Sequence, residues 1–135
     1  MEVFLDYAEA ELNFDSAALF ESLQQCSADL LDRLEFGVIG FDTSNIVCRY
    51  NATESRLAGL TTSSVLGQHV FETVAPCMNN FMVAQQFVDA LAGRTAVDCV
   101  IDYVLTLRMR PQRVKLRLLA KPDCNMRYVI VKRSN

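Results

Sequence analysis

The sequence predicts an α+β fold, a five-stranded antiparallel sheet with helices on one face and an N-terminal helical cap. Five segments carry a strand pattern, and three of them follow one another at the C-terminal end with only short breaks between them. Segments with helical periodicity lie before and between the two groups of strands. Strands joined by hairpins favour an antiparallel sheet on which helices pack.

The composition is that of one ordinary globular domain. The chain has 135 residues, of which 51% are hydrophobic and 21% charged, and this length is enough for a single core. No apolar run approaches the roughly 20 residues that a membrane span needs. The acidic N-terminus has no early basic residue of the kind that a secretory signal carries. We therefore expect a cytoplasmic protein without a membrane partner.

Cysteine and histidine usage argues against disulfides and zinc. The five cysteines are an odd set without a C-x-x-C spacing, which is typical of proteins in a reducing cytosol. His69 is the only histidine and has no ligand pair beside it, so a zinc site is not expected.

Charge is distributed unevenly along the chain, although the net charge is only −3. Residues 1–35 hold nine acidic residues and one basic residue, whereas residues 102–135 hold nine basic and two acidic residues. A basic end can be a nucleic-acid surface. Because the two charges nearly cancel, we favour docking of the acidic part on the basic part, or two solvated faces, and expect no nucleic-acid partner.

The N-terminal part predicts a helix that begins at Asp15 or Ser16, either of which can serve as its N-cap. Five apolar residues at helical spacing form one stripe along this helix: Leu19, Leu23, Cys26, Leu30 and Leu34. We therefore divide the chain into a helical cap, residues 1–34, and a core, residues 35–135, within one domain overall.

The core predicts strands and helices in a fixed order. The expected strands are 36–41, 46–50, 97–107, 113–121 and 126–133. Short helical pieces are expected at 52–59, 63–67 and 69–75, followed by a longer helix at 81–92. The core face of that longer helix is predicted from the spacing of Phe81, Ala84, Val88 and Leu91. The helical middle section would lie across the sheet and form a pocket there.

Two stretches carry candidate chemistry. Cys77 follows Pro76 at a forced change of chain direction, so its thiol sits in a rigid local frame. Tyr50 and Glu54 lie four residues apart, close to one face if Asn51 opens a helix. Each has a simpler reading. Cys77 can be a small core residue, Tyr50 a core tyrosine, and Glu54 the partner of Asn51 in a capping box, which spacing alone favours.

Several short motifs together resemble the PAS fold and, within it, the photoactive yellow protein family. The similarity runs from about Leu34 to Arg133. It rests on Phe36-Gly37, Tyr50-Asn51-Ala52 with Glu54, Gly59, Gly67, Val74-Ala75-Pro76-Cys77, Met109 with Pro111, and Val131-Lys132-Arg133.

The resemblance implies a covalent chromophore. Cys77 would carry p-coumaric acid as a thioester, Tyr50 and Glu54 would hydrogen-bond its phenolate oxygen, and Met109 would assist its return to the ground state. The rest of the expected binding site is Ala58, Leu60, Phe71 and Leu105. Three of these positions depart from the family pattern. Ala58 replaces a threonine, Leu105 replaces an aromatic residue, and Leu60 replaces an arginine and would seal the pocket as an apolar lid.

The function that the resemblance implies is a blue-light photoreceptor rather than an enzyme. Photoisomerisation would be followed by proton transfer from Glu54, since burial favours a neutral carboxyl group, and by loosening of the N-terminal cap. The signal would pass to an unidentified downstream protein or through a homodimer. The alternatives are a chromophore-free PAS sensory or protein-interaction module and a thiol enzyme. The thiol enzyme needs an activating base, and His69 has no evident orienting acid.

Overall fold

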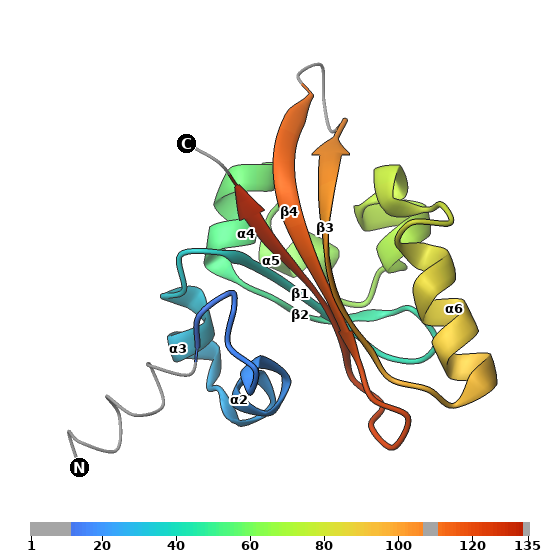
Figure 1. Ribbon diagram of the computed structural model, residues 1–135. Coiled ribbons are helices and arrows are strands. Elements are labelled where there is room, and N and C mark those ends of the chain that lie inside the picture. Colours follow the sequence, from blue (N-terminus) through green and yellow to red (C-terminus); the bar gives the residue numbers. More distant parts are fainter. Residues whose placement is uncertain (1–11, 107–110, 134–135) are drawn as a thin grey trace, which may run out of the picture.

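The computed structural model describes residues 12–106 and 111–133 and contains a five-stranded antiparallel sheet (Figure 1). The strand order is β2-β1-β5-β4-β3. The strands are β1 (Gly37–Phe41), β2 (Val47–Tyr50), β3 (Val97–Leu105), β4 (Gln112–Ala120) and β5 (Arg127–Arg133). All five predicted strands are therefore confirmed, as is the α+β class. The last residue of the predicted third strand, residue 107, lies outside the described residues.

The middle of the sheet is strand β5, which pairs with β1 on one side and with β4 on the other. Gly37 is opposite Val131, and Val114 is opposite Arg133. The tight connection between β1 and β2 is stabilised by Asp42, whose carboxylate accepts hydrogen bonds from the backbone N–H groups of Ser44 and Ile46. Such local side-chain bonds are what favour aspartate at turns.

The N-terminal cap contains two helices, α2 (Leu19–Gln25) and α3 (Ala28–Asp32). The prediction of one helix beginning at Asp15 or Ser16 is wrong in this respect. The chain is extended at Cys26, and the Ser27 hydroxyl accepts a hydrogen bond from the N–H of Leu30 at 3.1 Å, so a new helix begins there. A serine that can cap a helix competes with its continuation.

The middle section holds the short helical pieces that the sequence predicts. They are α4 (Ala52–Ala58), α5 (Thr62–Val65), a π-helical turn η1 (Val70–Val74) and a 3₁₀ turn η2 (Pro76–Met78). Helix α6 (Ala84–Gly93) follows.

The predicted core face of the long helix is wrong except at Ala84. The buried residues of α6 are Ala84, Phe87 and Ala90, whereas Phe81 is 80% exposed. Val88 and Leu91 are also exposed. The Oδ1 atom of Asn80 accepts hydrogen bonds from the backbone N–H groups of Met82 and Val83, which directly precede α6, so the helix begins later than its apolar spacing suggests.

Helices lie on both faces of the sheet (Figure 1), and an apolar layer fills the space on each face. One, the helix-side core, lies against α5, α6 and the two short turns. The other, the cap-side core, lies against α2 and α3. Strand β5 serves both layers, since Val129 and Val131 belong to the helix-side core and Tyr128 and Ile130 to the cap-side core. This alternation follows from the two-residue period of a strand.

Arginine side chains fasten the cap to the sheet. Arg49 donates to the carbonyl oxygens of Leu23 and Cys26, each at 2.6 Å, at the C-terminal end of α2. Arg117 donates to the carbonyl oxygens of Phe14 and Ser16.

An ion pair joins the acidic and basic parts of the chain. It forms between Glu21 on α2 and Lys121 beside β4, as the favoured reading of the charge distribution expects. The hydrogen bond that Lys121 donates to the Glu21 carboxylate lowers the pKa of Glu21.

Candidate functional site

Asn51 fixes the start of helix α4 and is completely buried. Its Oδ1 atom accepts hydrogen bonds from the N–H groups of Glu54 and Val38, at 3.1 and 2.9 Å. Its amide nitrogen donates to the carbonyl oxygens of Leu31 and Phe36, each at 3.0 Å. The predicted N-cap is confirmed, and this one side chain also ties α4 to β1 and to the cap.

The capping box that spacing alone favours forms only in its first half. The backbone N–H of Asn51 donates to the carbonyl oxygen of Val38 instead of to the Glu54 carboxylate. Glu54 is 2% exposed, and its two oxygens accept hydrogen bonds from the guanidinium of Arg133 at 2.7 and 3.0 Å. Both side chains of this ion pair are buried. Arg133 belongs to the motif Val131-Lys132-Arg133, from which no role for its side chain is predicted.

Gly37 leaves the space that the Glu54 carboxylate fills. A Cβ atom on residue 37 would lie 1.9 Å from Oε1 of Glu54, far inside the contact distance of two such atoms. Glycine is used where another group must approach the backbone this closely. The Phe36-Gly37 motif therefore has a direct structural reason, which is the position of the buried acid.

Tyr50 ends strand β2 and belongs to the helix-side core, where it is 4% exposed. Burial raises the pKa of its phenol, the nearby Glu54 carboxylate raises it further, and the Arg133 guanidinium lowers it. The Tyr50 hydroxyl makes no hydrogen bond within the described part of the chain. A neutral phenol in this position is a donor available to a ligand oxygen.

Cys77 lies in the 3₁₀ turn η2, where Pro76 is the first residue. The thiol is half-buried and packs against the helix-side core. The carbonyl oxygen of Cys77 accepts hydrogen bonds from the Tyr103 hydroxyl at 2.5 Å and from the Asn80 side chain at 3.3 Å. The bond from Tyr103 holds the turn on strand β3. Sequence reasoning missed Tyr103 as part of the site, and its inward position on an alternating strand is the signal that could have found it.

A cavity of about 820 Å³ opens beside Cys77 between η2 and strands β3 and β4. Its lining includes Asn80, Met82, Tyr103, Arg113 and Val114. Neither Tyr50 nor Glu54 lines this cavity. The structure therefore places the thiol at the rim of the core, between a cavity that opens to the outside and the apolar interior that holds Tyr50.

Three of the remaining predicted residues belong to the same interior or pack against it. Phe71 and Leu105 are buried in the helix-side core with Tyr50, and Leu60 packs against it. Ala58 is buried at the end of α4. Met109 lies outside the described residues.

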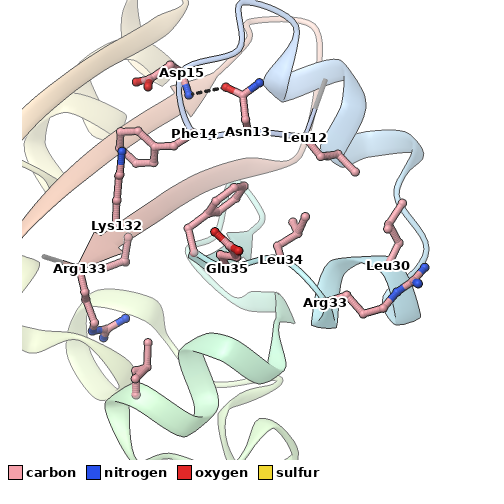
Figure 2. Close-up of a pocket in the computed structure, with 13 residues that line it drawn as sticks. Leu12, Asn13, Phe14, Asp15, Leu30, Arg33, Leu34, Glu35, Lys132 and Arg133 are labelled. Carbon is pink, nitrogen blue, oxygen red and sulfur yellow. Dashed lines mark hydrogen bonds between the residues drawn. The ribbon is translucent and has the colours of Figure 1, made fainter. Parts of the chain in front are cut away.

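A second cavity, of about 850 Å³, lies between the cap and the end of β5 (Figure 2). Lys132 and Arg133 leave β5 in different directions there. Lys132 reaches the Phe14 ring, with its Nζ atom 5.5 Å from the centroid, and Arg133 points towards α4. The Glu54–Arg133 pair thus lies between the helix-side core and the space beneath the cap.

No group of three or more potential metal-ligating side chains gathers among residues 12–106 and 111–133. In the same part of the chain, no helix is long and apolar enough to cross a membrane.

Solved structures identify the class of fold. The PAS domain of an HTR-like protein from Haloarcula marismortui superposes with a TM-score of 0.59 at 17% identity, covering 84% of this chain and 99% of that one. This likeness shows a PAS fold. The photoactive yellow protein domain of the sensor histidine kinase Ppr from Rhodospirillum centenum superposes with a TM-score of 0.77 at 30% identity, covering 84% and 98% of the two chains.

Sequence comparison gives the family. No family model matches the chain. Photoactive yellow protein of Halochromatium salexigens is 31% identical over 122 residues, which cover 90% of this chain and 97% of the relative. The protein of the same name from Rhodobacter capsulatus is 28% identical, over 76% of this chain and 82% of its own. The chain belongs to the photoactive yellow protein family.

Proposed function

We propose that this protein is a blue-light photoreceptor that binds p-coumaric acid as a thioester on Cys77. The observation that supports this most is the position of the thiol. Cys77 lies at the edge of the apolar core that buries Tyr50, in a chain of the photoactive yellow protein family. The same core provides apolar neighbours on the side away from solvent.

The residues present fit this chromophore. A planar aromatic ring needs apolar neighbours, which Phe71 and Leu105 supply, and Leu60 packs at the edge as the proposed lid. A buried phenolic oxygen needs a donor, and the Tyr50 hydroxyl is available. The thiol needs access from outside, which the cavity beside Cys77 gives. When bound, the chromophore supplies light absorption and isomerisation of its double bond.

The chain's own groups would then hold and move one proton. In the chain with bound chromophore, Tyr50 would donate to the phenolic oxygen through its hydroxyl. Glu54 would hold a proton on its carboxyl group in that state and release it after light absorption. Met109, which lies outside the described residues, remains a proposed aid to recovery.

Proton release from Glu54 would create a buried charge. An unpaired carboxylate in the interior is costly to the fold, by several kcal/mol. The N-terminal cap is the element that we propose loosens in response, and polar bonds such as those of Arg49 contribute to its attachment. We propose that the signal passes to a cytoplasmic partner or through a second copy of the chain.

Reconstitution with an activated ester or thioester of p-coumaric acid tests the assignment. The Cys77 thiolate would attack the acyl carbon, form the S–C bond and expel the activating group. We expect a mass increase of one coumaroyl group and a visible absorption band. Cys99 is a matched control because it is also half-buried against the helix-side core. Cys99→Ser should load normally and Cys77→Ser should not, and full loading of Cys77→Ser would contradict the assignment.

A chromophore-free PAS module is the second candidate, and one observation favours it. Glu54 already has a complete partner in Arg133 within the chain, so the buried acid does not need a ligand. A protein that stays colourless and unmodified after supply of the activated acid would support this alternative.

A thiol enzyme finds less support, because the imidazole of His69 is used in a helix cap. Its Nδ1 atom accepts hydrogen bonds from the N–H groups of Phe71 and Glu72, each at 3.1 Å, at the start of η1. We therefore propose a sensory role rather than an enzymatic one.

A further inference from the structure

The ion pair between Glu54 and Arg133 shows how this chain stabilises the acid when it is charged. Each carboxylate oxygen accepts one N–H of the guanidinium, at 2.7 and 3.0 Å. The side chains of Arg133 and Glu54 are 7% and 3% exposed. A paired fork of this kind is among the strong hydrogen-bonding arrangements that a carboxylate finds in a protein.

Arg133 is itself held in place from a second strand. Its Nε atom donates to Oε1 of Gln112, the first residue of β4, at 3.0 Å. Three elements therefore meet at this guanidinium, which extends from β5 to Gln112 on β4 and to Glu54 on α4. Gly37 on β1 leaves the room for the carboxylate.

The ion pair matters because the proposed function leaves a charge inside the protein. When Glu54 gives its proton to the phenolate oxygen of the ligand, one O–H bond breaks at the carboxyl group and another forms on the ligand. The negative charge moves to Glu54, and a buried charge without a partner opposes that transfer. The positively charged group that pairs with the Glu54 carboxylate therefore determines how completely the proton is transferred.

We propose that Arg133 is the counterion that captures the Glu54 carboxylate after proton transfer, and so is a positioning residue for the signalling state. This inference rests on the proposed function. Among the described residues, Arg133 is the cation in ion-pair contact with Glu54. Arg56, on the same helix as Glu54, is exposed, and Leu60 carries no charge.

The first test uses the chain without chromophore and reads the charge of Glu54 directly. Infrared spectra of protein labelled with ¹³C in its glutamate carboxyl groups, with Glu54→Gln subtracted to assign the band, distinguish the acid from the carboxylate. At neutral pH we expect a carboxylate in the unmodified chain and a protonated acid in Arg133→Gln. Arg133→Lys keeps a charge without the fork and should shift the Glu54 band part of the way towards the acid. Arg56→Gln removes a charge from the same helix and should change nothing.

A Glu54 band that is the same in Arg133→Gln and in the unmodified chain would overturn the inference. So would a protonated Glu54 in the unmodified chain. Far-ultraviolet circular dichroism of each variant checks that it folds. If Arg133→Gln does not fold, Arg133→Lys decides, because a shift of its band towards the acid is then the required result and an unshifted band contradicts the proposal.

The second test uses the chain loaded with p-coumaric acid. Light-induced ionisation of Glu54 should be smaller in Arg133→Gln by about tenfold or more, since hydrogen bonds to charged groups change equilibria by this amount. Arg56→Gln should behave as the unmodified chain. Equal ionisation in all three proteins would contradict the role of Arg133. Absence of loading would contradict the proposed function instead, and the first test would still decide the role of Arg133 as the counterion of Glu54.

Discussion

Arg49 and Tyr50 are consecutive residues of β2 whose side chains serve opposite faces of the sheet. Tyr50 is buried in the helix-side core. Arg49 extends the other way, to the carbonyl oxygens at the end of α2 and to the hydroxyl of Tyr128 at 3.1 Å. Alternation along a strand makes this arrangement unavoidable. Tyr50, which belongs to the proposed chromophore site, therefore directly follows Arg49, which attaches the cap to the sheet.

Arg49→Gln should loosen the cap while leaving the sheet intact. The change removes two charge-assisted bonds to backbone carbonyl oxygens, and one such bond contributes about 1.5–3 kcal/mol. We expect a loss of about 2–3 kcal/mol in the free energy of unfolding and faster amide hydrogen exchange in α2 and α3. Arg33→Gln is the control, since Arg33 is exposed on the same cap. Equal exchange in the two variants would show that Arg49 is not the fastening.

Tyr50→Phe should reduce the sensitivity of the fold to alkali. Burial, followed by the Glu54 charge, raises the pKa of Tyr50 above the value near 10 of an unfolded tyrosine. Its neutral form thus contributes stability that is fully present below about pH 10 and is lost as the pH rises towards the folded pKa. Denaturant unfolding between about pH 9 and 11 should show a shallower decline for Tyr50→Phe. Tyr128 has a raised pKa as well, through burial, so part of the decline should remain.

Gly37→Ala and Gly93→Ala should have opposite effects. A Cβ on residue 37 meets the Glu54 carboxylate at 1.9 Å, whereas a Cβ on residue 93 has its nearest contact at 3.8 Å. Overpacking of a core typically costs about 1–3 kcal/mol, and alanine in a helix is about 0.5–1 kcal/mol better than glycine. Thermal or denaturant unfolding measures both. A Gly37→Ala protein as stable as Gly93→Ala would mean that the carboxylate lies elsewhere.

Glu54→Gln distinguishes a role of Glu54 in proton transfer from a role limited to capping helix α4. Glutamine carries no charge, so this change leaves the buried Arg133 guanidinium without its counterion. Complete removal of one partner of a buried ion pair costs about 3–5 kcal/mol of stability. The chromophore-free variant should therefore lose more than the roughly 1 kcal/mol that a capping role predicts. The loaded variant should keep its colour with a shifted maximum, because glutamine is the weaker donor, and light should loosen residues 12–34 less. An unshifted spectrum together with unchanged light-driven exchange would exclude proton transfer from Glu54.

The sheet could be predicted from sequence because its signals are local. Alternating residues such as Tyr103 and Leu105 mark strand β3, and Asp42 marks a turn through bonds to its own neighbours. The rotation of α6 could not be predicted in this way. Phe87 rather than Val88 faces inward because it packs on the rings of Phe41 and Phe71, at centroid distances of 5.0 and 6.2 Å, and these lie far away in the sequence.

The candidate site divides in the same manner. The N-cap that Asn51 provides for helix α4 follows from a three-residue spacing and was predicted. The Glu54–Arg133 ion pair joins residues 79 positions apart, so no local sequence pattern predicts it. The hydrogen bond from Tyr103 to the Cys77 carbonyl oxygen joins residues 26 positions apart, which is also beyond the reach of a local pattern. Long-range polar pairs depend on sheet register, which has to be known before they can be inferred.

The cap-side core also limits how far the N-terminal cap can move away from the sheet. Val38, Leu119, Tyr128 and Ile130 are all nearly inaccessible, and together they form one apolar surface under the cap. A chain lacking residues 1–34 would present that surface to water, and exposed patches of this kind promote association. Complete detachment of the cap would therefore break the contacts of the cap-side core and expose its apolar surface to water. A cell would tolerate this state only briefly, or only where another protein takes the place of the cap.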